Sequence, residues 1–132
     1  MLKTALLTVS IIVVAFGLIL SGMFLFANDG IPLIALFTGL ALIIQGGFTI
    51  AYLGGALDPW KVWASQLFVS GEVASLLAGG LAFVQGFLYN MHPRNGDYEF
   101  GPMGLGVFMA AHAIIGLMYA SSSAAFRRAQ SS

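Results

Sequence analysis

Cysteine is absent from this chain of 132 residues. Its absence excludes disulfide bonds, thiolate metal sites, iron–sulfur clusters and cysteine nucleophiles. Charged side chains are also scarce, because Asp, Glu, Lys and Arg make up only 8% of the sequence and give a net charge of zero at pH 7. A nucleic-acid-binding protein needs a basic surface, and the only adjacent basic pair is Arg127-Arg128. We therefore exclude nucleic acid as a partner.

Catalytic motifs are missing as well. The chain has no G-x-x-x-x-G-K-[ST] phosphate loop, no G-x-S-x-G nucleophile turn and no H-E-x-x-H zinc motif, so we expect no enzyme activity. The longest polar segment carries His92, Asp97 and Glu99, which are possible metal ligands. Their irregular spacing around the Asn95-Gly96 turn is typical of a solvated loop, and we expect no metal there.

Hydrophobic residues dominate what remains, at 59% of the chain with a mean hydropathy of +0.94. This composition predicts an all-α, multi-pass membrane protein, because a bilayer core of roughly 30 Å needs about 20 apolar residues per helix. Four such runs are present, so we expect a single four-helix transmembrane domain over residues 1–132, folded as an up-down bundle. The expected spans are residues 5–27, 31–57, 61–90 and 102–126. The first run is too long for a signal-peptide core, so we expect a retained helix.

Basic residues near the ends of spans indicate the orientation, because they are retained in the cytoplasm. Lys3, Lys61, Arg127 and Arg128 fall on one side of the predicted spans, and Arg94 falls on the other. We therefore expect both termini to be cytoplasmic. The aromatic residues agree with this orientation. Trp60 and Trp63 are expected at the inner interface, and Phe24, Phe26, Tyr89, Tyr98 and Phe100 near the outer one.

Small residues recur at helical spacing within the spans. Gly71, Ser75 and Gly79 form a small-xxx-small stripe in the third span, and Gly106, Ala110, Gly116 and Ala120 serve the fourth. Such stripes let helix backbones approach closely. We expect contacts within the chain, with an oligomerisation surface as the alternative.

Polar residues inside the spans are the candidates for function. Gln45, Glu72 and His112 lie well inside the second, third and fourth spans. Gln45 and Glu72 are equally distant from the Asp58-Pro59 turn, and counting back from Arg127 places His112 within roughly one turn of their level. We expect these three side chains to form one intramembrane polar layer. Ser21, Thr49 and Ser75 are additional candidates for it.

Two interpretations of this layer stay open. A charged group in hydrocarbon costs at least about 2.5 kcal/mol, which favours a functional acid–base pair of Glu72 and His112 that carries protons. Alternatively, Glu72 is protonated or hydrogen-bonded to Gln45 and His112 and fixes the register of the helices.

His112 also has the chemistry of an axial ligand for haem or chlorophyll-type magnesium. The surrounding small residues leave room for a flat ring: Gly104, Gly106, Ala110, Ala111 and Gly116. His92, the other histidine, is expected outside the membrane, so such a site would need a ligand or an edge from another subunit.

Three functions follow in order of preference. The first is a small non-catalytic accessory subunit of a larger membrane complex of the respiratory, photosynthetic or membrane-oxygenase type, packed against other integral membrane subunits and bound lipids. The second is a small proton-coupled transporter that uses Glu72 with His112. Four spans in little over a hundred residues with one membrane-embedded glutamate resemble the architecture of the small multidrug-resistance transporters, whose glutamate is in the first span whereas Glu72 is in the third. The third is the cofactor site at His112.

Overall fold

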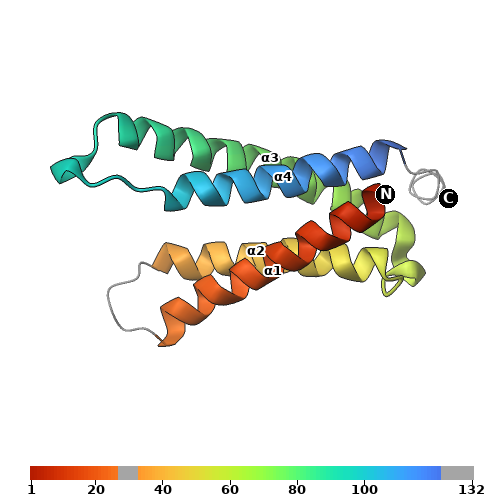
Figure 1. Cartoon of the computed structure of the whole chain (residues 1–132). Coiled ribbons are helices and arrows are strands. Elements are labelled where there is room, and N and C mark those ends of the chain that lie inside the picture. Colours follow the sequence, from red (N-terminus) through yellow and green to blue (C-terminus); the bar gives the residue numbers. More distant parts are fainter. Residues whose placement is uncertain (27–32, 123–132) are drawn as a thin grey trace.

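The computed structural model describes residues 1–26 and 33–122, and the fold is all-helical (Figure 1). The elements are α1 (Leu2–Phe26), α2 (Leu33–Leu53), the short 3-10 turn η1 (Asp58–Trp60), α3 (Lys61–Met91), the 3-10 turn η2 (Arg94–Gly96) and α4 (Gly101–Ser122). The four α-helices are each long and apolar enough to cross a membrane. The shortest, α2, has 21 residues and is about 31 Å long, close to the thickness of a bilayer core. This confirms the four predicted helices and is consistent with a multi-pass membrane protein.

Helix α2 ends at Leu53, four residues before the predicted end of the second span at residue 57. The cause is a Schellman motif at its C-terminus. The N–H of Ala56 donates to the carbonyl of Ala51 at 3.0 Å, and the N–H of Gly55 donates to Tyr52 at 3.4 Å. Gly55 has φ +86°, a conformation that glycine adopts without the steric cost of a side chain. The predicted boundary at residue 57 was therefore wrong, because the Gly54-Gly55 pair ends the helix at Leu53.

The loop that joins α3 to α4 is held by two hydrogen bonds that the side chain of Asn90 makes. The amide of Asn90 donates to the carbonyl of Glu99, and its oxygen accepts from the N–H of Glu99, both at 2.8 Å. Asn95 turns the chain with φ 56°, a conformation tolerated by Asn. Both helices begin and end within one residue of the predicted limits where these are described; residues 123–126 and 27–32 lie outside the described part.

Glycine contacts hold together the helices of each hairpin, which are α1 with α2 and α3 with α4. In the α1–α2 pair, a Cβ on Gly17 would lie 2.5 Å from the carbonyl oxygen of Gly39, and a Cβ on Gly46 would lie 2.6 Å from that of Ser10. In the α3–α4 pair, a Cβ on Gly79 would lie 2.8 Å from the carbonyl oxygen of Gly106. No side chain fits at these positions, so the helices pack backbone against backbone.

The stripe predicted on α3 divides between two environments. Gly79 packs against Gly106 and Ala110 of α4. Gly71 is exposed, with nothing within 4 Å of its Cβ position, and it lines a cavity together with Ser75. The expected helix contact therefore does not form at Gly71, because α2 and α3 belong to different pairs and touch little along their length.

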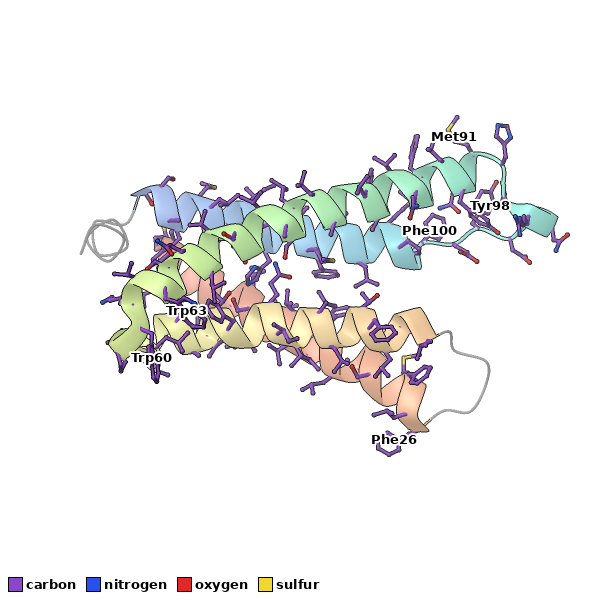
Figure 2. All side chains as sticks on the ribbon, turned by 180° about the vertical axis from the view of Figure 1, so that it is seen from behind. Phe26, Trp60, Trp63, Met91, Tyr98 and Phe100 are labelled. Carbon is purple, nitrogen blue, oxygen red and sulfur yellow. The ribbon has the colours of Figure 1, made fainter. Side chains whose placement is uncertain are left out.

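The two helical hairpins meet mainly through α1 and α4 (Figure 1). A hydrophobic core joins them near the beginning of α1, where Leu6, Phe68 and Ala120 are buried against one another. The labelled aromatic side chains lie toward the two ends of the molecule: Trp60 and Trp63 at one end, and Phe26, Tyr98 and Phe100 at the other (Figure 2). Many large apolar side chains on all four helices are exposed, as expected for helices surrounded by lipid.

Candidate functional site

His112 of α4 is fully buried and hydrogen-bonds to one side chain from each of the other three helices. Its Nε2 lies 2.8 Å from Oγ of Ser10 on α1. Its Nδ1 lies 3.0 Å from Oε2 of Glu72 on α3 and 3.1 Å from Nε2 of Gln45 on α2. A single imidazole thus connects both hairpins.

Glu72 is 2% exposed and lies beside a glycine on the partner helix. A Cβ on Gly116 of α4 would overlap the Oε2 atom of Glu72. Gly116 therefore leaves the space in which the carboxyl group reaches His112. Gly116, which was predicted to serve helix packing, thus accommodates the Glu72 side chain.

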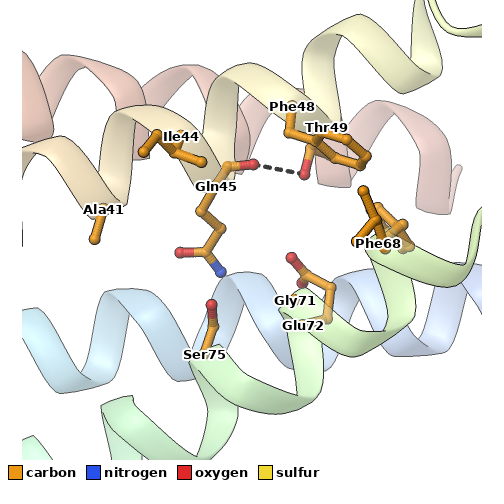
Figure 3. A pocket seen from close by; sticks show the side chains of 10 residues that line it. Ala41, Ile44, Gln45, Phe48, Thr49, Phe68, Gly71, Glu72 and Ser75 are labelled. Atoms are coloured by element: carbon orange, nitrogen blue, oxygen red, sulfur yellow. Dashed lines mark hydrogen bonds between the residues drawn. The ribbon is translucent and has the colours of Figure 1, made fainter. Parts of the chain in front are cut away.

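Gln45 extends from α2 toward Glu72 and Ser75 on α3 (Figure 3). Its backbone carbonyl accepts a hydrogen bond of 2.9 Å from the hydroxyl of Thr49, one turn later. Its side-chain oxygen Oε1 is buried and has no hydrogen-bond partner among the residues that the structure describes. The amide can therefore turn over without breaking a bond at this oxygen.

The hydrogen-bond donors define where protons reside in this cluster. The Ser10 hydroxyl donates its only proton to the carbonyl of Leu6 at 2.7 Å, so it accepts from Nε2–H of His112. Nδ1 of this tautomer has a single lone pair, which can accept from either the Gln45 amide at 3.1 Å or a protonated Glu72 carboxyl group at 3.0 Å. In one arrangement the Glu72 carboxyl group carries a proton and donates it to Nδ1. Both Glu72 and His112 are then uncharged.

A second arrangement has the same number of protons. Transfer of the carboxyl proton to Nδ1 makes an imidazolium that donates to the Glu72 carboxylate across the 3.0 Å contact. The Gln45 amide must then turn its oxygen toward Nδ1, because two donors cannot face each other. The two arrangements differ in whether Oε2 of Glu72 or Nδ1 of His112 carries the shared proton, and in which atom of the Gln45 amide faces Nδ1.

A cavity of about 390 Å³ lies beside Glu72, between α2 and α3 (Figure 3). It is largely apolar, and Gln45, Thr49, Glu72 and Ser75 are the polar residues in its wall. It forms where α2 and α3 fail to pack closely. Ala41 lines both this cavity and a larger one of about 830 Å³, which lies between the hairpins toward the α3–α4 loop. The cavity beside Glu72 is therefore adjacent to a second one that lies toward one end of the molecule.

Aromatic side chains separate the cavity from the opposite end. Phe68 lines the cavity and is buried. Its ring stacks on Tyr52 with centroids 5.4 Å apart and meets Tyr119 edge-on at 6.5 Å. Tyr52 and Tyr119 in turn line a polar pocket at the end where α3 begins. The rings of Tyr52, Phe68 and Tyr119, called here the aromatic layer, lie between the two spaces.

The structure brings Gln45, Glu72 and His112 together, and it adds one residue that the sequence reasoning missed. Ser10 lies eight residues after the start of α1, about 12 Å along the helix, and His112 lies at a similar distance from the end of α4. The depth count could not have identified it, because Ser10 lies only seven residues after Lys3, whereas Gln45 and Glu72 lie 13–14 residues from the Asp58-Pro59 turn. Ser21, an additional candidate for the layer, instead lies against Gly39, and its buried hydroxyl has no hydrogen-bond partner within residues 1–26 and 33–122.

The residues around His112 do not fit an axial ligand of haem or chlorophyll. Such a ligand presents one ring nitrogen to the metal, whereas both nitrogens of His112 bond to protein side chains and the ring is fully buried. Within residues 1–26 and 33–122, no group of three His, Cys, Asp or Glu side chains is arranged to hold a metal ion.

No protein-family model matches the chain, and neither a curated protein nor a solved structure does so.

Proposed function

We propose that this protein is a small proton-coupled transporter in which Glu72 and His112 bind and release the coupling proton. The observation that carries the proposal is the 3.0 Å contact between their buried side chains, beside a cavity that Glu72 itself lines. Ionisable residues within a membrane span are costly, which makes such a pair a candidate functional site. A pair that adjoins a cavity can exchange its proton with a molecule that enters.

The proposal includes a topology. The chain is a single transmembrane domain that crosses the bilayer four times as an up-down bundle, with both termini in the cytoplasm. The support is the position of Lys3 and Lys61 at one end of the helices and of Arg94 at the other. In this orientation the larger cavity opens toward the outer side, and the aromatic layer lies toward the cytoplasm.

The cavities support a small, largely apolar cargo. Their walls are mostly hydrocarbon, and their sizes are in the range of about 300–1,000 Å³ typical of small-molecule sites. The gap between α2 and α3 also gives a lateral route from lipid to Glu72. Cargo and proton would compete for the carboxyl group, which is the simplest form of coupled exchange.

His112 supplies the link between the proton and a change of shape. It bonds to Ser10 and Gln45 of one hairpin and to Glu72 of its own hairpin. Moving a proton onto Nδ1 turns that atom from an acceptor into a donor, so Gln45 must accept a hydrogen bond from it instead of donating one. The hydrogen bond between the hairpins therefore depends on whether Glu72 or His112 carries the proton. A change in hairpin separation would move Phe68 and alter access from the cytoplasmic end.

Reconstituted vesicles test this function. The purified protein is placed in liposomes that contain a trapped pH indicator, and a panel of apolar amines, acids and neutral compounds is added outside. We expect at least one class to produce a proton flux that is lost in Glu72→Gln and His112→Gln. Asp97→Asn and His92→Gln are matched controls in the exposed loop and should keep the flux. An unchanged flux in Glu72→Gln, or no flux with any compound, would contradict the proposal.

An accessory subunit of a larger membrane complex is the second candidate. The observation that favours it is a set of uncovered small residues: nothing lies within 4 Å of the Cβ positions of Gly22, Gly47, Gly71, Gly80 and Gly104. Such positions allow close approach by helices of a neighbouring integral membrane subunit. Mild-detergent extraction followed by native electrophoresis distinguishes the two functions. A large assembly favours the subunit, and a small species of this chain alone favours the transporter.

A further inference from the structure

The end of the molecule where α1 and α3 begin has a polar pocket of about 240 Å³. It is lined by side chains that are far apart in sequence, including Lys3, Tyr52, Asp58, Lys61 and Tyr119. The pocket differs from the two cavities near Glu72, whose walls are mainly apolar. It lies on the other side of the aromatic layer, so it is separate from the proposed transport site.

Positive charge is concentrated in this pocket. Residues 1–26 and 33–122 contain the basic side chains Lys3, Lys61 and Arg94, and the first two line it. One acidic residue, Asp58, also lines it. Its carboxylate is 3.9 Å from the ammonium of Lys61, and both side chains are about half exposed. A surface pair at this separation contributes little, so the Lys61 ammonium can bind another anion.

The charges match one class of ligand. Two lysines and one aspartate give the pocket a net charge of +1, which a phosphodiester with one negative charge neutralises. Asp58 can accept hydrogen bonds from hydroxyl groups beyond the phosphate, and a zwitterionic headgroup would instead leave one positive charge uncompensated. The pocket lies at the end of the helices near Trp60, where lipid headgroups are found in the proposed topology.

We propose that this pocket binds the headgroup of an anionic phospholipid of the phosphatidylglycerol type, through the ammonium groups of Lys3 and Lys61 and the carboxylate of Asp58. The acyl chains extend along the exposed apolar surfaces of the neighbouring helices. Lysines near a membrane surface attract anionic lipids, and this attraction is short-ranged. Binding there connects the beginnings of α1 and α3 and so joins the two hairpins at this end.

Native mass spectrometry of the full chain in a neutral detergent tests the site. Phosphatidylglycerol or phosphatidylcholine is titrated into wild type, Lys3→Gln, Lys61→Gln and the double variant. We expect wild type to bind phosphatidylglycerol preferentially, and each single variant to lose about fivefold in affinity for it. Arg94→Gln is the matched control, because it removes a basic residue at the opposite end. Thermal unfolding of each variant shows that the fold is retained.

Three results would overturn the inference. The first is equal retention of both lipids by wild type. The second is the same loss of affinity in Arg94→Gln as in the double variant. The third is displacement of phosphatidylglycerol by millimolar inorganic phosphate, which would identify a site for the free anion rather than for a lipid. The lysine variants leave Glu72 and His112 unchanged. Lipid affinity in these variants tests the lipid site, whereas the vesicle proton flux tests only the proposed transport function.

Discussion

The Nδ1 atom of His112 lies 3.0 Å from the Oε2 atom of Glu72, and both side chains are buried between α4 and α3. The same imidazole bonds to Ser10 and Gln45 on the other hairpin. Removing His112 therefore affects both the packing of α3 with α4 and the contact between the hairpins.

Replacing His112 by alanine should destabilise the fold. The change leaves Glu72 buried without its partner and opens a void among three helices. We expect a loss of about 2–4 kcal/mol in the free energy of unfolding, measured in detergent micelles. His92→Ala removes an exposed imidazole from the loop after α3 and should change stability by less than about 0.5 kcal/mol. Equal effects of the two variants would contradict the buried network.

Infrared spectroscopy tests the uncharged arrangement of the Glu72–His112 pair, in which Glu72 carries the proton. In the uncharged arrangement the Glu72 carboxyl donates to Nδ1, whereas exposed carboxyl groups in water are ionised at pH 7. We expect the carboxyl C=O stretching band to disappear in Glu72→Gln and to persist in Glu99→Gln. Persistence of the band in Glu72→Gln would assign it to another group.

Adding one methyl group at Gly116 should displace Glu72 from His112. A Cβ there overlaps Oε2, and the helix backbone gives little room to adjust. Gly116→Ala should cost about 1–3 kcal/mol and weaken the carboxyl signal described above. Gly104→Ala on the same helix places its Cβ in open space. It should be neutral or stabilising by up to about 1 kcal/mol, because alanine favours helix.

The contact between α3 and α4 should depend on Gly79 and not on its neighbour. A Cβ on Gly79 would lie 2.8 Å from the carbonyl oxygen of Gly106, whereas Gly80 faces open space. We expect Gly79→Ala to lower the thermal unfolding temperature in detergent and Gly80→Ala to leave it unchanged or raise it. The reverse order would show that the helices pack through a different face.

Truncating Phe68 should open the aromatic layer. The chain has no cysteine, so Ser75→Cys provides a single label in the cavity wall. In this background we expect Phe68→Ala to increase the rate at which a small water-soluble thiol reagent reacts when supplied at the Trp60 end. Phe83→Ala is a control, because Phe83 stacks on Phe87 and lies outside this layer. An unchanged rate would mean that Phe68 does not limit access.

Several features of the fold could be predicted from local sequence alone. The four helices follow from apolar runs interrupted by polar turns, and the Gly54-Gly55 pair carried enough information to end α2 at Leu53. The common depth of Gln45, Glu72 and His112 followed from counting residues, since the rise per residue of a helix is fixed. These properties depend on residues close together in the chain, which is why the sequence determines them.

Tertiary structure decided which faces meet. Ser10 was selected as the partner of His112 because α1 crosses α4 near its beginning, and no pattern within α1 specifies that crossing. Gly79 became a packing residue and Gly71 a cavity wall, although both belong to one stripe. The physical reason is that backbone contacts between glycines close each hairpin, whereas the hairpins meet over a small surface. Where α2 and α3 remain apart, the buried carboxyl group gains its cavity.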